Sequence, residues 1–237
     1  MRRPIVSTLL SLTAAVALAL TPVGVRAELP WDTDAHTRYA ALGDSLAAGF
    51  GAVPVTQGYV YLLYQRGVFD TVPNTILANL GVPGATSQFV LDYQVPQICT
   101  NPFFHPDAIT LNVGGNDLLM IQAPGDVPAV LFTFQTNLAQ ILGALRTCAP
   151  DARIYIGNQY AISEIPGTDP LIDALNSIIA GVAAGFGVPV ADVHTAFEGR
   201  TGLLLIERHG ADQLQVHPTN AGYRVIADAF MTVIQSP

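Results

Sequence analysis

The chain has 237 residues, of which 50% are hydrophobic and 12% are charged, and its formal net charge is −8. This acidic character disfavours nucleic acid or an anionic lipid surface as the main partner. The basic residues are all arginines, and the absence of lysine excludes a P-loop, a Ser-x-x-Lys acyl-enzyme and Schiff-base catalysis.

The N-terminal segment has the features of a secretory signal peptide. Two arginines precede a short apolar run at residues 9–20, and residues 25–27 fit a small-x-Ala cleavage site. A membrane span needs about 20 apolar residues, whereas Pro22 ends this run earlier. We therefore expect residues 1–27 to be removed and residues 28–237 to form one secreted, extracellular domain without stable membrane insertion. The mature domain then has 7 arginines, 18 acidic residues and a formal charge of −11.

Short apolar or β-branched runs alternate with longer segments of helical periodicity in the rest of the chain. The short runs predict five strands, at residues 38–43, 75–81, 108–114, 153–159 and 188–193. Apolar residues that recur every three or four positions predict helices over residues 131–145, 171–182 and 223–233. Asp169-Pro170 and Gly185 are the expected ends of the second helix, and Thr219 is the expected cap of the third. The alternation predicts an α/β domain with three layers, in which helices cover both faces of an open parallel sheet.

Two cysteines, Cys99 and Cys148, precede the third and the fourth predicted strands. An even number of cysteines in an exported protein favours a disulfide, and two free buried thiols are the alternative. A Cys99–Cys148 disulfide would lie at the amino-terminal edge of the sheet. No Cys-x-x-Cys or His-Glu-x-x-His spacing occurs, and we expect neither a metal nor a cofactor.

Four residues that could take part in catalysis follow the predicted strands. Ser45 comes after the first strand, Gly84 after the second and Asn116 after the third. His217 falls in the predicted loop between the fifth strand and the last helix. Because ligands bind beyond the carboxyl ends of parallel strands, we expect these residues to lie together at one edge of the sheet.

These residue types are suited to acyl transfer. A serine hydroxyl becomes a nucleophile when a neutral histidine takes its proton, so Ser45 is the candidate nucleophile and His217 the candidate base. The oxyanion needs fixed donors, which the backbone N–H groups of Ser45 and Gly84 and the carboxamide of Asn116 can supply. The helix that starts after His217 would help to keep the ring neutral. Each residue alone has a simpler explanation as a cap or turn residue, but their shared edge favours a catalytic site.

The same residues carry a resemblance to a known family. Gly43-Asp44-Ser45, Gly84, the sequence GGND at residues 114–117 and HPTNAGY at residues 217–223 resemble the four blocks of the SGNH (GDSL-type) hydrolases, in the same order. The resemblance implies a flavodoxin-like sheet of five parallel strands in the order 2-1-3-4-5. It also implies a serine esterase or lipase in which Ser45 is the nucleophile, His217 the base, and Ser45, Gly84 and Asn116 the oxyanion hole.

One position departs from the family pattern. The family commonly has an aspartate three residues before the histidine, where this chain has Leu214. Either Asp212 or a main-chain carbonyl is then expected to orient the ring of His217. The carbonyl is favoured, because Asp212 would reach the ring only through a special turn.

The substrate is predicted less closely than the chemistry. Leu118, Leu119 and Met120 follow Asn116, and they either line an acyl pocket or pack in the core. We expect hydrolysis of short- to medium-chain acyl esters, from small molecules, lipids or glycans, by a monomer. A carbohydrate O-deacetylase of the same fold is an alternative. A non-catalytic flavodoxin-like binding protein, suggested by Leu214, is another.

Overall fold

The structure, a computed structural model, describes residues 36–69, 75–165, 167–209 and 213–236. All of them belong to one unit of the chain, Thr33–Pro237. Residues 1–27 lie outside the described part, so the signal peptide and the domain boundary at residue 28 stay predictions. No helix in the described ranges has both the length and the hydrophobicity of a membrane span.

Five parallel strands form the central sheet, in the order β2-β1-β3-β4-β5. The strands are β1 (Thr37–Gly43), β2 (Thr75–Asn79), β3 (Ala108–Asn112), β4 (Arg153–Gly157) and β5 (Val190–Ala191). This confirms the predicted strands and their predicted order. The predicted ends of β2 to β5 were two residues too late. At β3 the reason is visible, because Gly114 has a φ of 125° and turns the chain out of the extended conformation.

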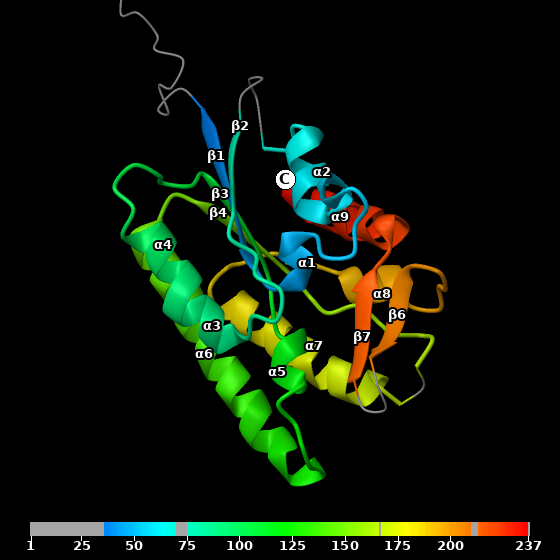
Figure 1. The fold of residues 1–237 in the computed structure, drawn as a ribbon. Helices are drawn as coiled ribbons and strands as arrows, with labels where there is room; N and C mark the ends of the chain where they lie inside the picture. The colour runs from blue at the N-terminus through cyan, green and yellow to red at the C-terminus, as the bar shows by residue number, and fades with distance from the viewer. Residues whose placement is uncertain (1–35, 70–74, 166, 210–212, 237) are drawn as a thin grey trace, which may run out of the picture. The chain divides into compact units, whose positions relative to one another are not determined.

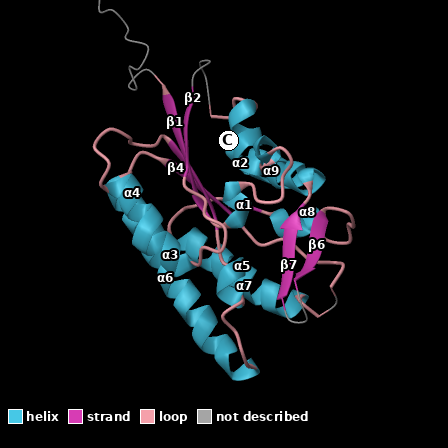
Figure 2. Ribbon diagram, viewed as in Figure 1, coloured by secondary structure: helices cyan, strands magenta, loops and turns pink. Residues whose placement is uncertain are grey.

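Helices cover both faces of the sheet, as predicted for a three-layer α/β/α domain (Figures 1 and 2). One face carries α2 (Tyr59–Gln65), α8 (Val193–Phe197) and α9 (Asn220–Ile234). The other carries α3 (Ser87–Phe89), the π-helical segment η3 (Val90–Gln94), α4 (Val95–Cys99), α6 (Val127–Cys148) and α7 (Asp169–Gly185). Successive residues of β1 point to opposite faces and join the two apolar cores in turn.

The ends of the long helices agree with the cap signals in the sequence, with one exception. Helix α7 ends at Gly185, and Thr219 caps α9 by accepting a hydrogen bond from the N–H of Gly222 at 3.2 Å. The exception is the start of α7, where Thr168 is the cap and Asp169 is already the first helical residue. Pro170 still lies in the first turn, where its missing N–H has no helical acceptor to lose.

An antiparallel hairpin precedes α9, and this element was not predicted. It consists of β6 (Leu204–His209) and β7 (Gln213–Pro218). His217 therefore lies in a strand, and the predicted loop position was wrong. Residues 203–206 are all apolar and show no alternation with period two, which is why the pattern did not indicate a strand. Ile206 and Val216 pair with each other and pack on the core beside α9.

A disulfide joins Cys99 at the end of α4 to Cys148 at the end of α6, with 5.2 Å between their Cα atoms. The predicted pairing is present. Strands β3 and β4 start after these helices, so the bridge lies at the amino-terminal edge of the sheet, opposite the edge where Ser45 follows β1.

Candidate active site

Ser45 is the first residue of a short helix, α1 (Ser45–Ala48), directly after β1. Gly43 ends the strand with a φ of 136°, and a Cβ atom there would collide with the main-chain oxygen of Asn112. Asp44 then caps α1, because its Oδ1 accepts a hydrogen bond from the N–H of Leu46 at 2.9 Å. This tight turn from strand to helix fixes Ser45 at the carboxyl edge of the sheet. Asp44 therefore shapes the turn.

The structure brings His217 to Ser45 across 172 residues of sequence. Nε2 of His217 lies 3.0 Å from Oγ of Ser45, within hydrogen-bond distance. The hydroxyl of Tyr160 donates to the main-chain oxygen of Val216 at 2.7 Å. This bond fixes the strand of the hairpin that carries His217. The ring of Phe50 packs against the imidazole with 4.6 Å between their centroids. The predicted nucleophile and base are thus in direct contact.

The protonation of His217 suits a base. Burial lowers the pKa of the imidazole below its ordinary value of 6.5, and the negative charge of Glu207 opposes this effect. The neutral ring is therefore the main form near pH 7. A neutral Nε2 that accepts the Ser45 proton is the state in which a histidine can act as general base.

The predicted oxyanion donors follow the carboxyl ends of three neighbouring strands, β1, β2 and β3. The N–H of Ser45 is in the first turn of α1 and has no intrahelical acceptor. Asn116 lies in α5 (Gly115–Leu118), and its Nδ2 donates to the oxygen of Ala85 at 2.9 Å, which leaves its second N–H for another acceptor. Gly84 has a φ of 83°, and a Cβ there would meet no atom within 4 Å. Glycine is therefore required at position 84 for the backbone angle rather than for space within the protein.

Asp117 ties the loops after β2 and β3 together. Its Oδ2 accepts from the N–H of Ser87 at 2.9 Å and its Oδ1 from the hydroxyl of Ser87. Asn137 on α6 donates to the same hydroxyl at 3.0 Å. Burial raises the pKa of Asp117, and the hydrogen bonds from Ser87 oppose this. Asp117 therefore fixes the loop that carries Gly84 to the helix that carries Asn116.

Gln94 is a residue that the sequence analysis missed. From the π-helical segment η3, its Oε1 accepts from the N–H of Gly43 at 2.7 Å and its Nε2 donates to the oxygen of Gly43 at 2.8 Å. The oxygen of Gly43 also accepts from the N–H of Val82 at 3.1 Å. Gly43 and Val82 each stand two residues before a site residue, Ser45 and Gly84. The run at residues 87–99 contains three glutamines, and nothing in the sequence marks Gln94 as the buried one or reveals its partner.

The predicted orienting partner of His217 falls on a part of the hairpin that the structure does not fully describe. Asp212 lies outside the described residues, as does the side chain of Leu214, so the choice between Asp212 and a carbonyl is not decided. Leu205 is directly opposite His217 in the hairpin, which places Glu207 diagonally on the same face. Glu207 is therefore a charge beside the base that sequence reasoning missed, because the hairpin itself was not predicted.

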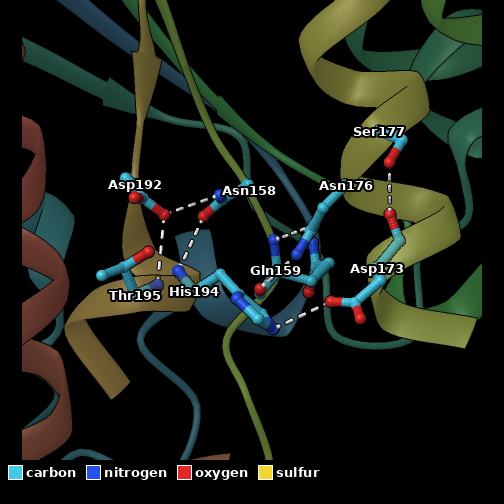
Figure 3. A network of polar contacts seen from close by, with 8 residues as sticks. All are labelled: Asn158, Gln159, Asp173, Asn176, Ser177, Asp192, His194 and Thr195. Carbon is cyan, nitrogen blue, oxygen red and sulfur yellow. Dashed lines mark hydrogen bonds and ion pairs between the residues drawn. The ribbon is translucent and has the colours of Figure 1, made fainter. Parts of the chain in front are cut away.

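A second polar network at the carboxyl ends of β4 and β5 has a structural role (Figure 3). Asp192 caps α8 by accepting from the N–H of Thr195 at 3.1 Å, and it also accepts from Asn158 at 3.0 Å. Asn158 in turn accepts from the N–H of His194 at 2.8 Å. Nε2 of His194 lies 3.4 Å from Asp173 on α7. These contacts join α7 and α8 to the sheet. Within the described part of the chain, no cluster of three or more His, Cys, Asp or Glu side chains suits a metal ion.

Comparison with known proteins agrees with this geometry. A family model described as the GDSL-like Lipase/Acylhydrolase family matches residues 41–225. The chain belongs to this family. The resemblance found in the sequence is thereby confirmed, and the protein is an acylhydrolase that cleaves ester bonds. A non-catalytic binding protein is no longer supported. A search of curated proteins gave no match.

Several solved structures share the fold at low sequence identity. An extracellular lipase from Streptomyces rimosus is 21% identical, covers 83% of this chain and 99% of its own, and has a TM-score of 0.61. A phospholipase A1 from Streptomyces albidoflavus is 20% identical, covers 83% of this chain and 99% of its own, and has a TM-score of 0.59. An acetylxylan esterase from Geobacillus stearothermophilus is 18% identical, covers 85% of this chain and 95% of its own, and has a TM-score of 0.62. At this identity the neighbours establish the fold of this GDSL-family chain, and not its substrate.

Proposed function

We propose that this GDSL-family chain is a secreted serine ester hydrolase that acts on short- to medium-chain acyl esters through an acyl-enzyme. Ser45 is the nucleophile and His217 is the base. The observation that carries the proposal is the 3.0 Å contact between Nε2 of His217 and Oγ of Ser45. It lies at the sheet edge that also holds the N–H donors of Gly84 and Asn116.

In acylation, Oγ of Ser45 attacks the ester carbonyl carbon while Nε2 of His217 takes the hydroxyl proton. The carbonyl oxygen becomes an oxyanion and accepts hydrogen bonds from the N–H donors of Ser45, Gly84 and Asn116. When this intermediate collapses, the bond to the alcohol oxygen breaks. The imidazolium of His217 gives its proton to that oxygen, and the alcohol leaves.

Deacylation repeats the sequence with water. His217 takes a proton from a water molecule, whose oxygen attacks the acyl carbon and forms a second oxyanion on the same donors. The bond between the acyl carbon and Oγ of Ser45 then breaks, and His217 returns the proton to Oγ. The carboxylic acid is released and the starting state is restored without a change in oxidation state.

The residues after Asn116 favour a substrate with an aliphatic acyl group. Leu118 packs partly buried against the core, as one of the two sequence interpretations expected. Leu119 and Met120 instead expose 73% and 60% of their surface. Exposed apolar side chains beside the oxyanion donors offer contact area to an acyl chain that leaves water.

Carbohydrate O-deacetylation is the second candidate, because one structural neighbour is an acetylxylan esterase. That likeness concerns the fold, whereas the exposed Leu119 and Met120 favour longer acyl chains. The ratio of activity on acetyl esters to activity on butyryl and octanoyl esters separates the two functions.

Export, the monomeric state and the absence of a nucleic-acid partner are parts of the same proposal. The disulfide between Cys99 and Cys148 supports export, because such bonds persist in oxidising compartments. Recovery of protein that starts near residue 28 from the culture medium tests export and cleavage. Light scattering of that protein tests the monomer.

The deciding experiment is hydrolysis of p-nitrophenyl esters from acetyl to palmitoyl by the wild type, Ser45→Ala and Ser177→Ala. We expect Ser45→Ala to lose at least about a thousandfold in kcat. Ser177→Ala, which changes an exposed serine that bonds only to the oxygen of Asp173 on its own helix, is expected to keep wild-type activity. Equal activity of wild type and Ser45→Ala would contradict the proposal.

A further inference from the structure

The side of the site next to His217 receives the alcohol part of an ester. His217 must give its proton to the leaving oxygen, so this oxygen lies within about 3 Å of Nε2 during collapse. The carbonyl oxygen lies instead with the N–H donors of Ser45, Gly84 and Asn116. The group attached to the leaving oxygen therefore contacts whatever side chains surround the imidazole.

Two exposed apolar side chains, Phe50 and Leu205, lie beside the imidazole, and a third, Val53, is on the segment that follows Phe50. The ring of Phe50 packs on it with 4.6 Å between centroids and is 44% exposed. Leu205 is the direct cross-strand neighbour of His217 and is 42% exposed. Val53 is 77% exposed, and both its main-chain N–H and its oxygen bond to the side chain of Asn220, at 2.9 and 2.6 Å. Asn220 is only three residues beyond His217.

The segment that carries Phe50 is fixed against the catalytic pair. The N–H of Phe50 donates to the oxygen of Ser45 at 2.9 Å, and its oxygen accepts from the hydroxyl of Tyr223 on α9 at 2.6 Å. A Cβ atom at the next residue, Gly51, would lie 3.5 Å from Cβ of His217. The fold thus holds the segment of Phe50 next to His217 before any substrate binds.

The segment that carries Phe50 and Val53, residues 45–65, has no charged residue of its own, although Arg224 on α9 donates to the side chain of Gln57 at 3.3 Å. Glu207, on the same hairpin face as Leu205, acts on His217 with a negative charge. An anionic alcohol would meet this charge, and a sugar would place hydroxyl groups against Phe50 and Leu205 without hydrogen-bond partners.

We propose that Phe50, Val53 and Leu205 form a leaving-group subsite that selects esters of apolar, uncharged alcohols. This inference rests on the proposed function, since it uses His217 as the proton donor to the leaving oxygen. It assigns specificity to the alcohol side, independently of the length of the acyl chain.

The test compares three butyrate esters that differ only in the alcohol. Heptyl butyrate carries an apolar alcohol, 2-(2-methoxyethoxy)ethyl butyrate has the same chain length with two ether oxygens, and 6-butyryloxyhexanoate carries an anionic end. We expect kcat/KM for the heptyl ester to exceed each of the other values by about tenfold or more. Similar values for the three esters, or a preference for a polar one, would overturn the subsite.

Variants locate the selectivity. Phe50→Ala and Leu205→Asn are each expected to reduce the ratio of heptyl to ether ester at least threefold. Phe132→Ala, on the exposed side of α6 where Phe132 is 70% exposed, is the matched control and should keep the wild-type ratio. An unchanged ratio in both subsite variants, with thermal unfolding showing intact folds, would overturn the assignment. If no ester is hydrolysed, or if Ser45→Ala is equally active, the proposed function itself fails.

Discussion

The side chain of Gln94 hydrogen-bonds to both main-chain groups of Gly43, accepting from its N–H at 2.7 Å and donating to its oxygen at 2.8 Å. Gln94 thus occupies the place that a neighbouring strand would take beside the end of β1. Because the oxygen of Gly43 also accepts from Val82 at 3.1 Å, the same contact links the turn before Ser45 to the loop before Gly84. The distance between nucleophile and oxyanion donor therefore depends on Gln94.

Replacing Gln94 should impair the chemical step more than substrate binding. Methionine has a similar length but cannot bond to Gly43, so Gln94→Met leaves the N–H of Gly43 without its partner, a loss of about 1–3 kcal/mol in stability. Small displacements of reacting groups act on kcat. We expect kcat to fall about tenfold or more, with KM changed less than threefold, in steady-state assays on the best p-nitrophenyl ester.

The matched control for this prediction is Gln97→Met, one helical turn further along. Gln97 is exposed, and its side chain only donates to the oxygen of Tyr93 at 2.9 Å. It should keep both kcat and KM. A Gln94→Met protein that is less stable but has wild-type kcat would show that the glutamine only supports the fold.

The pH dependence of kcat/KM should follow the protonation of His217. Burial lowers the pKa of the ring below 6.5, and activity requires the neutral form, so activity should rise with pH through a midpoint below 6.5. The charge of Glu207 favours the imidazolium. Its removal in Glu207→Gln should therefore move the midpoint to a lower pH.

The control for the pH profile is Glu198→Gln, which removes another exposed carboxylate. Its profile should match that of the wild type. A midpoint that moves upward in Glu207→Gln, or that moves equally in both variants, would contradict a direct action of Glu207 on the base.

The sequence was sufficient for the parts of the fold that repeat a local pattern. Parallel strands that are buried on both faces appear as short apolar runs, and the loops after them carried Ser45, Gly84 and Asn116 to one edge. Long-range side-chain contacts leave no such pattern. Gln94 and Gly43 are 51 residues apart, and nothing in the residues between them indicates the contact.

The hairpin was missed for a different reason. Its first strand is apolar on both sides over residues 204–206, since one face packs on the core and the other, at Leu205, lies beside the active site. This hides the alternation that marks a strand with one solvated face. The effect of Glu207 on His217 depends on the register of this hairpin and therefore could not be predicted from the sequence.

Loss of the disulfide should cost stability without loss of catalysis. Cys99 and Cys148 are 49 residues apart, and by the chain-entropy estimate such a bridge stabilises by up to about 4 kcal/mol. The double variant with alanine at both positions should unfold about 8–16 °C lower. Below that temperature its kcat/KM should equal the wild-type value, because the bridge lies at the edge opposite Ser45. A large loss of activity in the folded double variant would contradict this separation.

The carboxyl group of Asp44 should make the protein less stable as the pH rises. Burial, with a smaller contribution from the charge of Asp117, raises the pKa of Asp44 from 3.8 to about 7, although the N–H of Leu46 opposes the shift. Between these two values the folded protein keeps a proton that the unfolded chain has released, so unfolding becomes easier with increasing pH. Asp44→Asn removes the titration while its side-chain oxygen can still cap α1.

We therefore expect the free energy of unfolding of Asp44→Asn to rise relative to the wild type by about 2–3 kcal/mol between pH 5 and pH 8. Urea unfolding at pH 5, 6.5 and 8 measures this difference. Asp151→Asn, at an exposed carboxylate, is the control and should run parallel to the wild type. A constant difference between Asp44→Asn and the wild type at all three pH values would mean that Asp44 is already ionised at pH 5, and that the turn before Ser45 tolerates a buried charge.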